Sequence, residues 1–193
     1  MTLDPNTALI PIDVQQAFDH APWPKRNNPA MEANGQRLLR AWRASGRPLV
    51  HVKHDSIAPG STLAATHPGN AFRAGFEPQG NEPLVRKSVN AAFIGTDLDL
   101  RLRRLGVTAV VLFGISTDMC VSTTARVAAN LGYRTIVVGD ACFCFDQPDA
   151  DGTPIPAEQI QRAHLATLRA EFAEVCDTDA LLAALAATPA IAA

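Results

Sequence analysis

The chain has 193 residues, of which 47% are hydrophobic and 19% are charged, and its formal net charge is −2. This length suits one domain with a buried core, and the near-neutral charge gives no indication of nucleic-acid binding. No apolar run is long enough to span a bilayer, and the N-terminus lacks a signal-peptide pattern. We therefore expect a single domain over 1–193, with about 186–193 as a frayed tail, in a cytoplasmic protein whose four cysteines are thiols.

Short runs rich in valine, isoleucine and leucine alternate with amphipathic segments along the chain. The runs predict strands at 8–13, 48–54, 83–88, 108–114, 133–141 and 173–177. The amphipathic segments predict helices at 31–46, 97–106, 118–132, 156–172 and 179–186. Continuous apolar strands separated by helices are typical of a parallel sheet that is covered on both faces. We expect a three-layer, doubly wound α/β fold, with a mainly parallel sheet of about six strands.

One connection, 55–82, is too long to be a simple loop and is expected to be a lid, a pocket wall or a subunit contact. It carries Ile57, Leu63, Phe72 and Phe76 among prolines and glycines, with too little regular structure to bury them. Large exposed apolar patches usually mark an interface, so the loop favours a homodimer or homotetramer. The alternative is that the loop folds back over its own sheet as a lid.

Three reactive residues fall at the carboxyl ends of the expected strands, where open parallel sheets bind their ligands. Asp13 ends the first strand, Lys87 ends the third, and Cys120 opens the helix after the fourth. Alone, each is ordinarily a turn residue, a solvated lysine or a small packed hydrophobe. Together they could form a reactive site. The Lys87 cation and the start of the helix would lower the pKa of the Cys120 thiol, and the Asp13 carboxylate would accept the thiol proton. The combination favours a nucleophilic Cys120.

The stretches "ALIPIDVQQAF", "VRKSVNAAFIGTDL" and "FGISTDMCVSTTARVAANLGY" resemble the cysteine hydrolases of the isochorismatase-like superfamily. The resemblance runs from about residue 8 to 172. It implies a parallel-sheet fold, an oligomer and a catalytic triad of Asp13, Lys87 and Cys120. It also implies a cis peptide at Ile115–Ser116 that turns the Ser116 N–H towards the pocket. With the Cys120 N–H, this group would form an oxyanion hole.

Several further side chains are candidates for the wall of the substrate pocket. They are Asn90, Phe93, Phe18, Trp23, His54 and Phe143. The stretch "SVNAAF" directly follows Lys87 at the edge of the site, which favours Asn90 and Phe93. For each phenylalanine, a place in the hydrophobic core is an equally good interpretation.

Nicotinamidases of this superfamily bind a metal through an Asp-x-His pair and a further histidine. The nearest stretch here is "HVKHDS", in which that pair is missing. Residues three apart on a strand point to opposite faces, so His51 and His54 are expected to diverge. We therefore expect no metal and no other cofactor, and expect neither nicotinamidase nor isochorismatase activity.

The leading hypothesis is a hydrolase that cleaves a C–N bond of a small amide or ureide through a thioester on Cys120. Its partner is then a small-molecule substrate, with no nucleic acid or membrane. One alternative is a non-hydrolytic ligand-binding protein on the same fold. Another is a thiol redox protein in which Cys142 or Cys144 resolves an oxidised Cys120.

Overall fold

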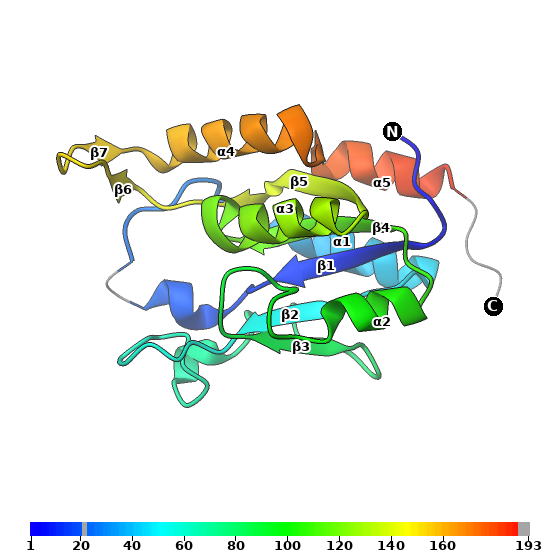
Figure 1. The fold of residues 1–193 in the computed structure, drawn as a ribbon, viewed down its shortest axis with the longest axis horizontal. Coiled ribbons are helices and arrows are strands. Elements are labelled where there is room, and N and C mark those ends of the chain that lie inside the picture. Colours follow the sequence, from blue (N-terminus) through cyan, green and yellow to red (C-terminus); the bar gives the residue numbers. More distant parts are fainter. Residues whose placement is uncertain (21–22, 189–193) are drawn as a thin grey trace.

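A computed structural model of the chain describes residues 1–20 and 23–188. Six strands form one parallel sheet in the order β3-β2-β1-β4-β5-β8 (Figure 1). Their bounds are β1 Thr7–Ile12, β2 His51–His54, β3 Leu84–Lys87, β4 Ala109–Ile115, β5 Arg134–Phe143 and β8 Glu174–Cys176. A separate antiparallel hairpin pairs β6 Gln147–Pro148 with β7 Pro154–Ile155. The predicted parallel sheet is confirmed.

Helices cover both faces of the sheet, as expected. They are α1 Met31–Ser45, α2 Leu98–Arg104, α3 Ser122–Asn130, α4 Ala157–Glu171 and α5 Thr178–Ala186, with short 3₁₀ turns η1 Gln16–Asp19 and η2 Pro68–Asn70. α1 and α5 contact each other and β5, whereas α3 and α4 contact each other and β5 from the other face. α2 lies on the α3 side (Figure 1). The chain reverses its direction of travel across the sheet between β1 and β4, which is where such sheets bind ligands.

Some element boundaries differ from the sequence expectation. The helix expected at 118–132 begins only at Ser122, because Thr117–Val121 form a π-helical turn. The strand expected at 48–54 is regular only from His51. α5 is capped by Asp177, whose side chain accepts from the Ala180 amide. α5 ends at Ala186, and 189–193 of the expected tail lie outside the described residues.

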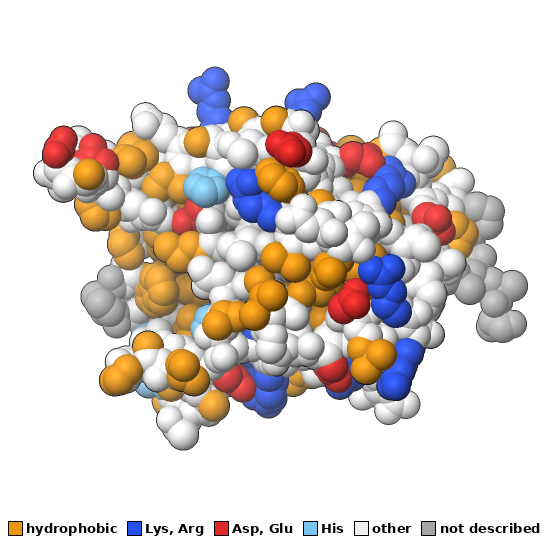
Figure 2. Space-filling model, viewed as in Figure 1, with side chains coloured by type: hydrophobic (Ala, Val, Ile, Leu, Met, Phe, Trp, Pro, Cys, Tyr) orange, Lys and Arg blue, Asp and Glu red, His pale blue; other side chains and the backbone are white. Residues whose placement is uncertain are grey.

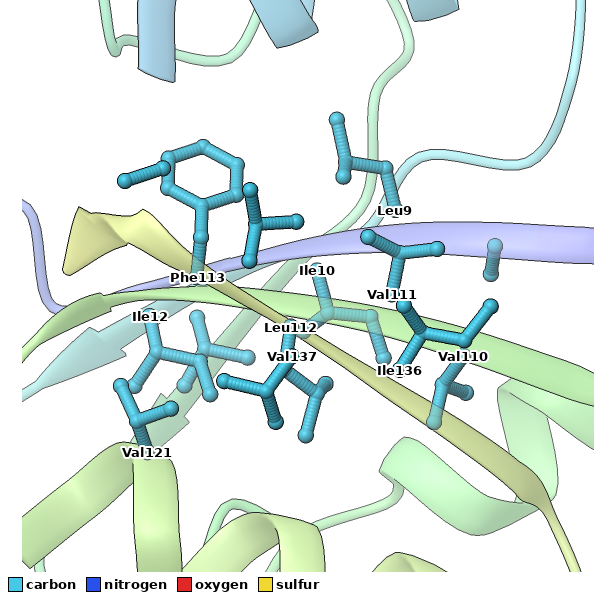
Figure 3. Close-up of a cluster of buried hydrophobic side chains, with 14 of the residues drawn as sticks. Leu9, Ile10, Ile12, Val110, Val111, Leu112, Phe113, Val121, Ile136 and Val137 are labelled. Carbon is cyan, nitrogen blue, oxygen red and sulfur yellow. The ribbon is translucent and has the colours of Figure 1, made fainter. Parts of the chain in front are cut away.

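The core lies on both sides of the central strands. Every residue of β1 and β4 is buried. Along β4, Val111 and Phe113 point to one face and Val110 and Leu112 to the other, so each face of the strand contributes to a packed layer (Figure 3). This double burial explains why these strands are apolar throughout instead of alternating.

The long loop buries more than its sequence suggested. Phe76 is 1% exposed and packs against Phe113, while Leu63 and Phe72 are half-buried. Ile57 alone of the four apolar side chains is largely exposed, at 85%. The inference that this loop cannot bury its apolar side chains is therefore wrong for Phe76, because the loop folds back against α1 and β4. The homodimer or homotetramer stays a prediction.

Within residues 1–20 and 23–188, no helix is both long and apolar enough to cross a membrane.

Candidate active site

The three reactive residues meet at the carboxyl end of the sheet. Asp13 directly follows β1, Lys87 is the last residue of β3, and Cys120 lies in the π-helical turn after β4. All three are buried. Lys87 Nζ lies 2.6 Å from Asp13 Oδ2 and 3.3 Å from Cys120 Sγ. The predicted convergence of an acid, a cation and a thiol is confirmed.

Asp13 has an unusual backbone conformation for a residue with a side chain. Its φ is +53°, in the left-handed region. This conformation costs roughly 1–2 kcal/mol for an L-residue other than glycine. Hydrogen bonds hold it in place, because the Asp13 amide donates to Val52 O at 2.9 Å and the Gln15 amide donates to Asp13 O at 2.8 Å. A strained backbone at the expected proton acceptor is typical of a functional position.

Gly114 lets β4 approach β1 just before the cysteine turn. Its φ is +137°, and a Cβ at this position would lie 2.0 Å from Ile12 O. Only glycine fits so close to a neighbouring backbone. The Ile115–Ser116 peptide that follows is cis, as the resemblance implied. The oxyanion hole of the Ser116 and Cys120 amides stays a prediction.

Burial dominates the protonation of the site. It raises the pKa of Asp13, although the Lys87 ammonium acts in the opposite direction. Burial and the nearby Asp13 carboxylate raise the pKa of Cys120 well above that of an ordinary thiol, again against Lys87. The expected lowering of the thiol pKa is therefore wrong for the resting site, and α3 itself begins two residues after Cys120. The resting site pairs a protonated thiol with a proton acceptor of raised pKa.

A cavity of about 280 Å³ opens over the thiol. Figure 2 shows the surface hollowed at this end of the sheet, with hydrophobic side chains around the hollow. The described residues that line it are Asp13, Phe18, Trp23, Pro24, His54, Leu63, Asn90, Ile115, Ser116, Met119, Cys120, Phe145, Asp146, Gln147 and Pro148. Phe18, Trp23, His54 and Asn90, predicted from sequence, are thus among its lining residues. Asn90 Oδ1 is 3.8 Å from Cys120 Sγ.

Two predicted pocket residues lie elsewhere. Phe93 is 8% exposed and stacks on Tyr133, with ring centroids 5.9 Å apart. Phe143 is fully buried in β5, where Arg26 lies 4.2 Å above its ring centroid and Phe18 meets it edge-on. Neither lines the cavity, because each ring is already enclosed by side chains of the core.

One aromatic residue of the cavity wall, which follows β5, was not predicted from the sequence. Phe145 stacks on Trp23, with ring centroids 5.0 Å apart and an interplanar angle of 27°. Phe18 lies 4.9 Å from the same Trp23 ring, so the three rings form one wall of the cavity. Phe145 and the nearby Gln147 come just after the carboxyl end of β5. The same positional argument that selected Asp13 and Lys87 would have found them.

Gln15, two residues after Asp13, has a structural role that was not predicted from the sequence. Its fully buried side-chain amide donates to His54 O at 3.0 Å and to Asn70 O at 2.9 Å. Its side-chain oxygen accepts from the His54 amide at 2.9 Å. Gln15 thus fastens the end of β2 to the segment that carries Asp13.

The two histidines of β2 diverge, as predicted. His51 Nε2 lies 2.8 Å from Glu82 Oε2, whereas His54 Nδ1 lies 2.9 Å from Lys87 Nζ on the other face. Among the described residues, Asp13, His54 and Cys120 offer one potential metal-ligand atom each, all within 4.8 Å of one another. Lys87 Nζ is within hydrogen-bonding distance of all three side chains, so an ammonium already occupies their shared position. These three acceptor atoms suit the Lys87 ammonium better than a metal ion. The absence of a metal stays a prediction.

A family model, the isochorismatase domain, matches residues 7–180. The chain belongs to the isochorismatase family. Among curated relatives of this family member, the uncharacterised isochorismatase family protein YrdC of Bacillus subtilis (strain 168) is 38% identical over 93% of this chain and 96% of its own length. A streptothricin hydrolase of Streptomyces noursei is 34% identical over 81% of this chain and 57% of its own length.

Solved structures of the isochorismatase family share the fold. A family member from Chromobacterium violaceum ATCC 12472 is 40% identical, with a TM-score of 0.94 over 97% of this chain and 98% of its own. A cysteine hydrolase from Pseudomonas syringae pv. phaseolicola 1448A is 27% identical, with a TM-score of 0.87 over 96% of this chain and 95% of its own. This chain is therefore an isochorismatase-family hydrolase.

Proposed function

We propose that this hydrolase cleaves the C–N bond of a small amide or ureide through a thioester on Cys120. The observation that carries the proposal is the Lys87 ammonium, which lies 2.6 Å from the Asp13 carboxylate and 3.3 Å from the Cys120 sulfur beside an open cavity. A nucleophile, a proton acceptor and a fixed cation are the parts that covalent amide hydrolysis requires. The named activities of the streptothricin hydrolase and cysteine hydrolase relatives support this class.

In the first half-reaction, Cys120 Sγ bonds to the substrate carbonyl carbon as its proton passes to Asp13. The carbonyl oxygen takes up the negative charge, which the Ser116 and Cys120 amides would stabilise. The C–N bond then breaks, and Asp13 returns the proton to the departing nitrogen. A neutral amine or ammonia leaves, and the acyl group remains on sulfur as a thioester.

In the second half-reaction, water attacks the thioester carbonyl while Asp13 accepts a proton from it. The C–S bond breaks, the proton returns to sulfur and a carboxylic acid is released. The raised pKa of Asp13 suits this double use, since the group must both take and give a proton. The Lys87 side chain, 2.6 Å from Asp13 Oδ2, keeps the carboxylate oriented.

The cavity favours an uncharged substrate. Phe18, Trp23 and Phe145 form an apolar wall, and the described lining residues include Asp13 and Asp146 but no lysine or arginine. A substrate carboxylate bound there would be desolvated beside these acids without an opposite charge in the lining. We therefore place uncharged amides ahead of amides that carry a carboxylate.

The test is release of amine or ammonia from a panel of small uncharged amides. We expect Cys120→Ala and Cys120→Ser to lose at least about a thousandfold in turnover, because each removes the thiol that would carry the acyl group. Thermal unfolding should change little. Cys176→Ala removes a half-buried thiol far from the triad and should keep full activity. Substantial hydrolysis by Cys120→Ala would contradict the mechanism.

No specific observation favours either alternative, the thiol redox protein or the non-hydrolytic ligand-binding protein. For the redox alternative, Cys142 and Cys144 are fully buried, and burial raises the pKa of each to about 12. Such thiols react slowly with oxidants. A purely ligand-binding protein would need neither a strained Asp13 nor an ammonium beside a thiol. Amide binding without any product release would nevertheless favour it.

A further inference from the structure

A fourth polar side chain completes the surroundings of the Lys87 ammonium. His54 pairs with Lys87 in the register of β2 and β3. Its Nδ1 lies 2.9 Å from Lys87 Nζ and 3.9 Å from Asp13 Oδ2. The His54 side chain is 12% exposed and lines the cavity.

The chemistry of the contact fixes the state of the ring. An ammonium can only donate hydrogen bonds, so His54 Nδ1 must accept one. The imidazole is then neutral and carries its proton on Nε2. Burial lowers the pKa of His54, and the neighbouring Lys87 charge lowers it further, which agrees with a neutral ring.

We propose that His54 is a positioning residue for Lys87. An ammonium has three N–H donors, and here three acceptors surround it: Asp13 Oδ2 at 2.6 Å, His54 Nδ1 at 2.9 Å and Cys120 Sγ at 3.3 Å. With one donor held by His54, the other two are directed at the carboxylate and the sulfur. Without His54, a fully buried ammonium would lack one acceptor and would be free to rotate away from the thiol.

The backbone of His54 is held in place by hydrogen bonds from two side chains. Gln15 binds both backbone groups of His54, and the Asn70 side chain donates to His54 O at 3.0 Å. A ring on a strand end fixed in this way is a rigid support for the lysine. Gln15, two residues after Asp13, is thereby connected to Lys87 through His54.

Two substitutions separate positioning from simple packing. His54→Asn places its side-chain oxygen near the position of Nδ1 and keeps an acceptor for Lys87. His54→Leu has a similar bulk and no acceptor. The readouts are kcat and KM on an amide that the wild type hydrolyses, and the rate of Cys120 alkylation by iodoacetamide at one fixed, mildly alkaline pH, followed by mass. The kinetic readout rests on the proposed function, whereas the alkylation readout needs no substrate.

We expect His54→Leu to lower kcat by about 10- to 100-fold with KM within about threefold, because misplacement of a catalytic group by an ångström has effects of this size. Its Cys120 alkylation at the fixed pH should be slower, since the thiolate loses a well-placed cation. His54→Asn should recover kcat to within about fivefold of the wild type and restore the alkylation rate. If His54→Leu does not fold, His54→Gln, whose amide lies too far along the side chain to replace Nδ1, takes its place.

His51→Asn is the matched control, on the same strand but the opposite face. It should lower thermal stability through the lost contact with Glu82 and leave kcat and the alkylation rate unchanged. A wild-type kcat and a wild-type alkylation rate in His54→Leu, or equal impairment of the Asn and Leu variants, would overturn the positioning role. A wild type that hydrolyses no amide would instead overturn the proposed function, and the alkylation series would still decide the role of His54.

Discussion

The Lys87–Asp13 ion pair illustrates how two residues of a proposed catalytic site can be costly for stability. The Lys87 side chain is 0% exposed and that of Asp13 is 1% exposed. Burial raises the pKa of Asp13 by more than the attraction of the Lys87 ammonium lowers it, so the loss of hydration of the carboxylate outweighs the ion pair. Buried ion pairs are commonly replaceable by apolar residues without loss of stability, whereas removal of one partner is strongly destabilising.

This imbalance predicts a non-additive pair of substitutions. Asp13→Asn suits the φ of +53°, since asparagine tolerates the left-handed region, but leaves Lys87 without a counter-charge. We expect it to lower the free energy of unfolding by about 3–5 kcal/mol. Asp13→Asn combined with Lys87→Met should recover most of this loss, because no buried charge remains. Urea unfolding at neutral pH measures both, and neither variant should hydrolyse amides.

A control for this comparison is Asp55→Asn, which breaks the partly exposed ion pair with Arg86. Exposed pairs contribute roughly 0–1 kcal/mol, so its effect should be small. If the double variant proves as unstable as Asp13→Asn alone, the uncompensated Lys87 charge is not the cause.

At the scale of elements, the site depends on how closely β4 approaches β1. The six residues of β1 pair with β4 from Thr7 opposite Ala109 to Ile12 opposite Gly114, and both strands then lead into the site. The close approach at Gly114 sets the separation between Asp13 and the Cys120 turn. A small local displacement here therefore changes catalytic distances.

Gly114→Ala should destabilise the protein by more than about 4 kcal/mol or prevent folding, because the new Cβ meets the Ile12 backbone oxygen and the φ of +137° is strained for alanine. The comparison is Gly139→Ala in β5, where the atom nearest to a new Cβ is Cδ1 of the Leu165 side chain, at 2.9 Å. That flexible side chain can move, so the cost should stay within about 1 kcal/mol. Soluble yield and thermal unfolding measure the difference; comparable stabilities would contradict this account.

At the scale of the whole molecule, a second polar cluster ties together the opposite end of the sheet. Glu82 accepts hydrogen bonds from the Arg43 side chain of α1, from the Gln79 amide and from His51 of β2. Burial alone would raise the pKa of Glu82, but these donors outweigh it and lower the pKa to about 2. The cluster joins a helix, a strand and the long loop.

A carboxyl group whose pKa is lowered by folding stabilises the fold at pH values above its pKa in the unfolded chain. This contribution is lost as the pH falls towards the pKa of the folded state. For Glu82 the window runs from 4.5 down to about 2, and the shift corresponds to at most about 3 kcal/mol. We expect Glu82→Gln to be less stable than the wild type at pH 7, with the two stabilities converging as the pH falls below 4.5. Denaturant unfolding at several pH values between 7 and 3 measures the difference in the free energy of unfolding between the two proteins.

The control is Glu174→Gln, whose ion pair with Arg134 is exposed and should show no such pH dependence. A Glu82→Gln variant whose deficit stays constant over the acid range would show that packing, and not the charge, is responsible.

The sequence by itself determined the order and type of the six strands of the sheet and the five α-helices, and the place of the triad, but not the β6–β7 hairpin or the π-helical turn. Hydrophobic period and turn residues are local properties, and the carboxyl ends of parallel strands necessarily share one edge of a sheet. Asp13, Lys87 and Cys120 could therefore be brought together without knowing their neighbours. Gly46 as the left-handed end of α1 was predictable for the same reason.

Only the tertiary structure decided which groups are enclosed and by what. Phe93 and Phe143 have the same composition cues as Phe18 and Phe145, yet the first two lie in the core and the others line the cavity. The raised pKa of Cys120 likewise depends on burial. The third hydrogen-bond acceptor of Lys87 is His54, which is 33 residues away from Lys87 along the chain. Desolvation and side-chain contacts are set by residues distant in sequence, so no local pattern encodes them.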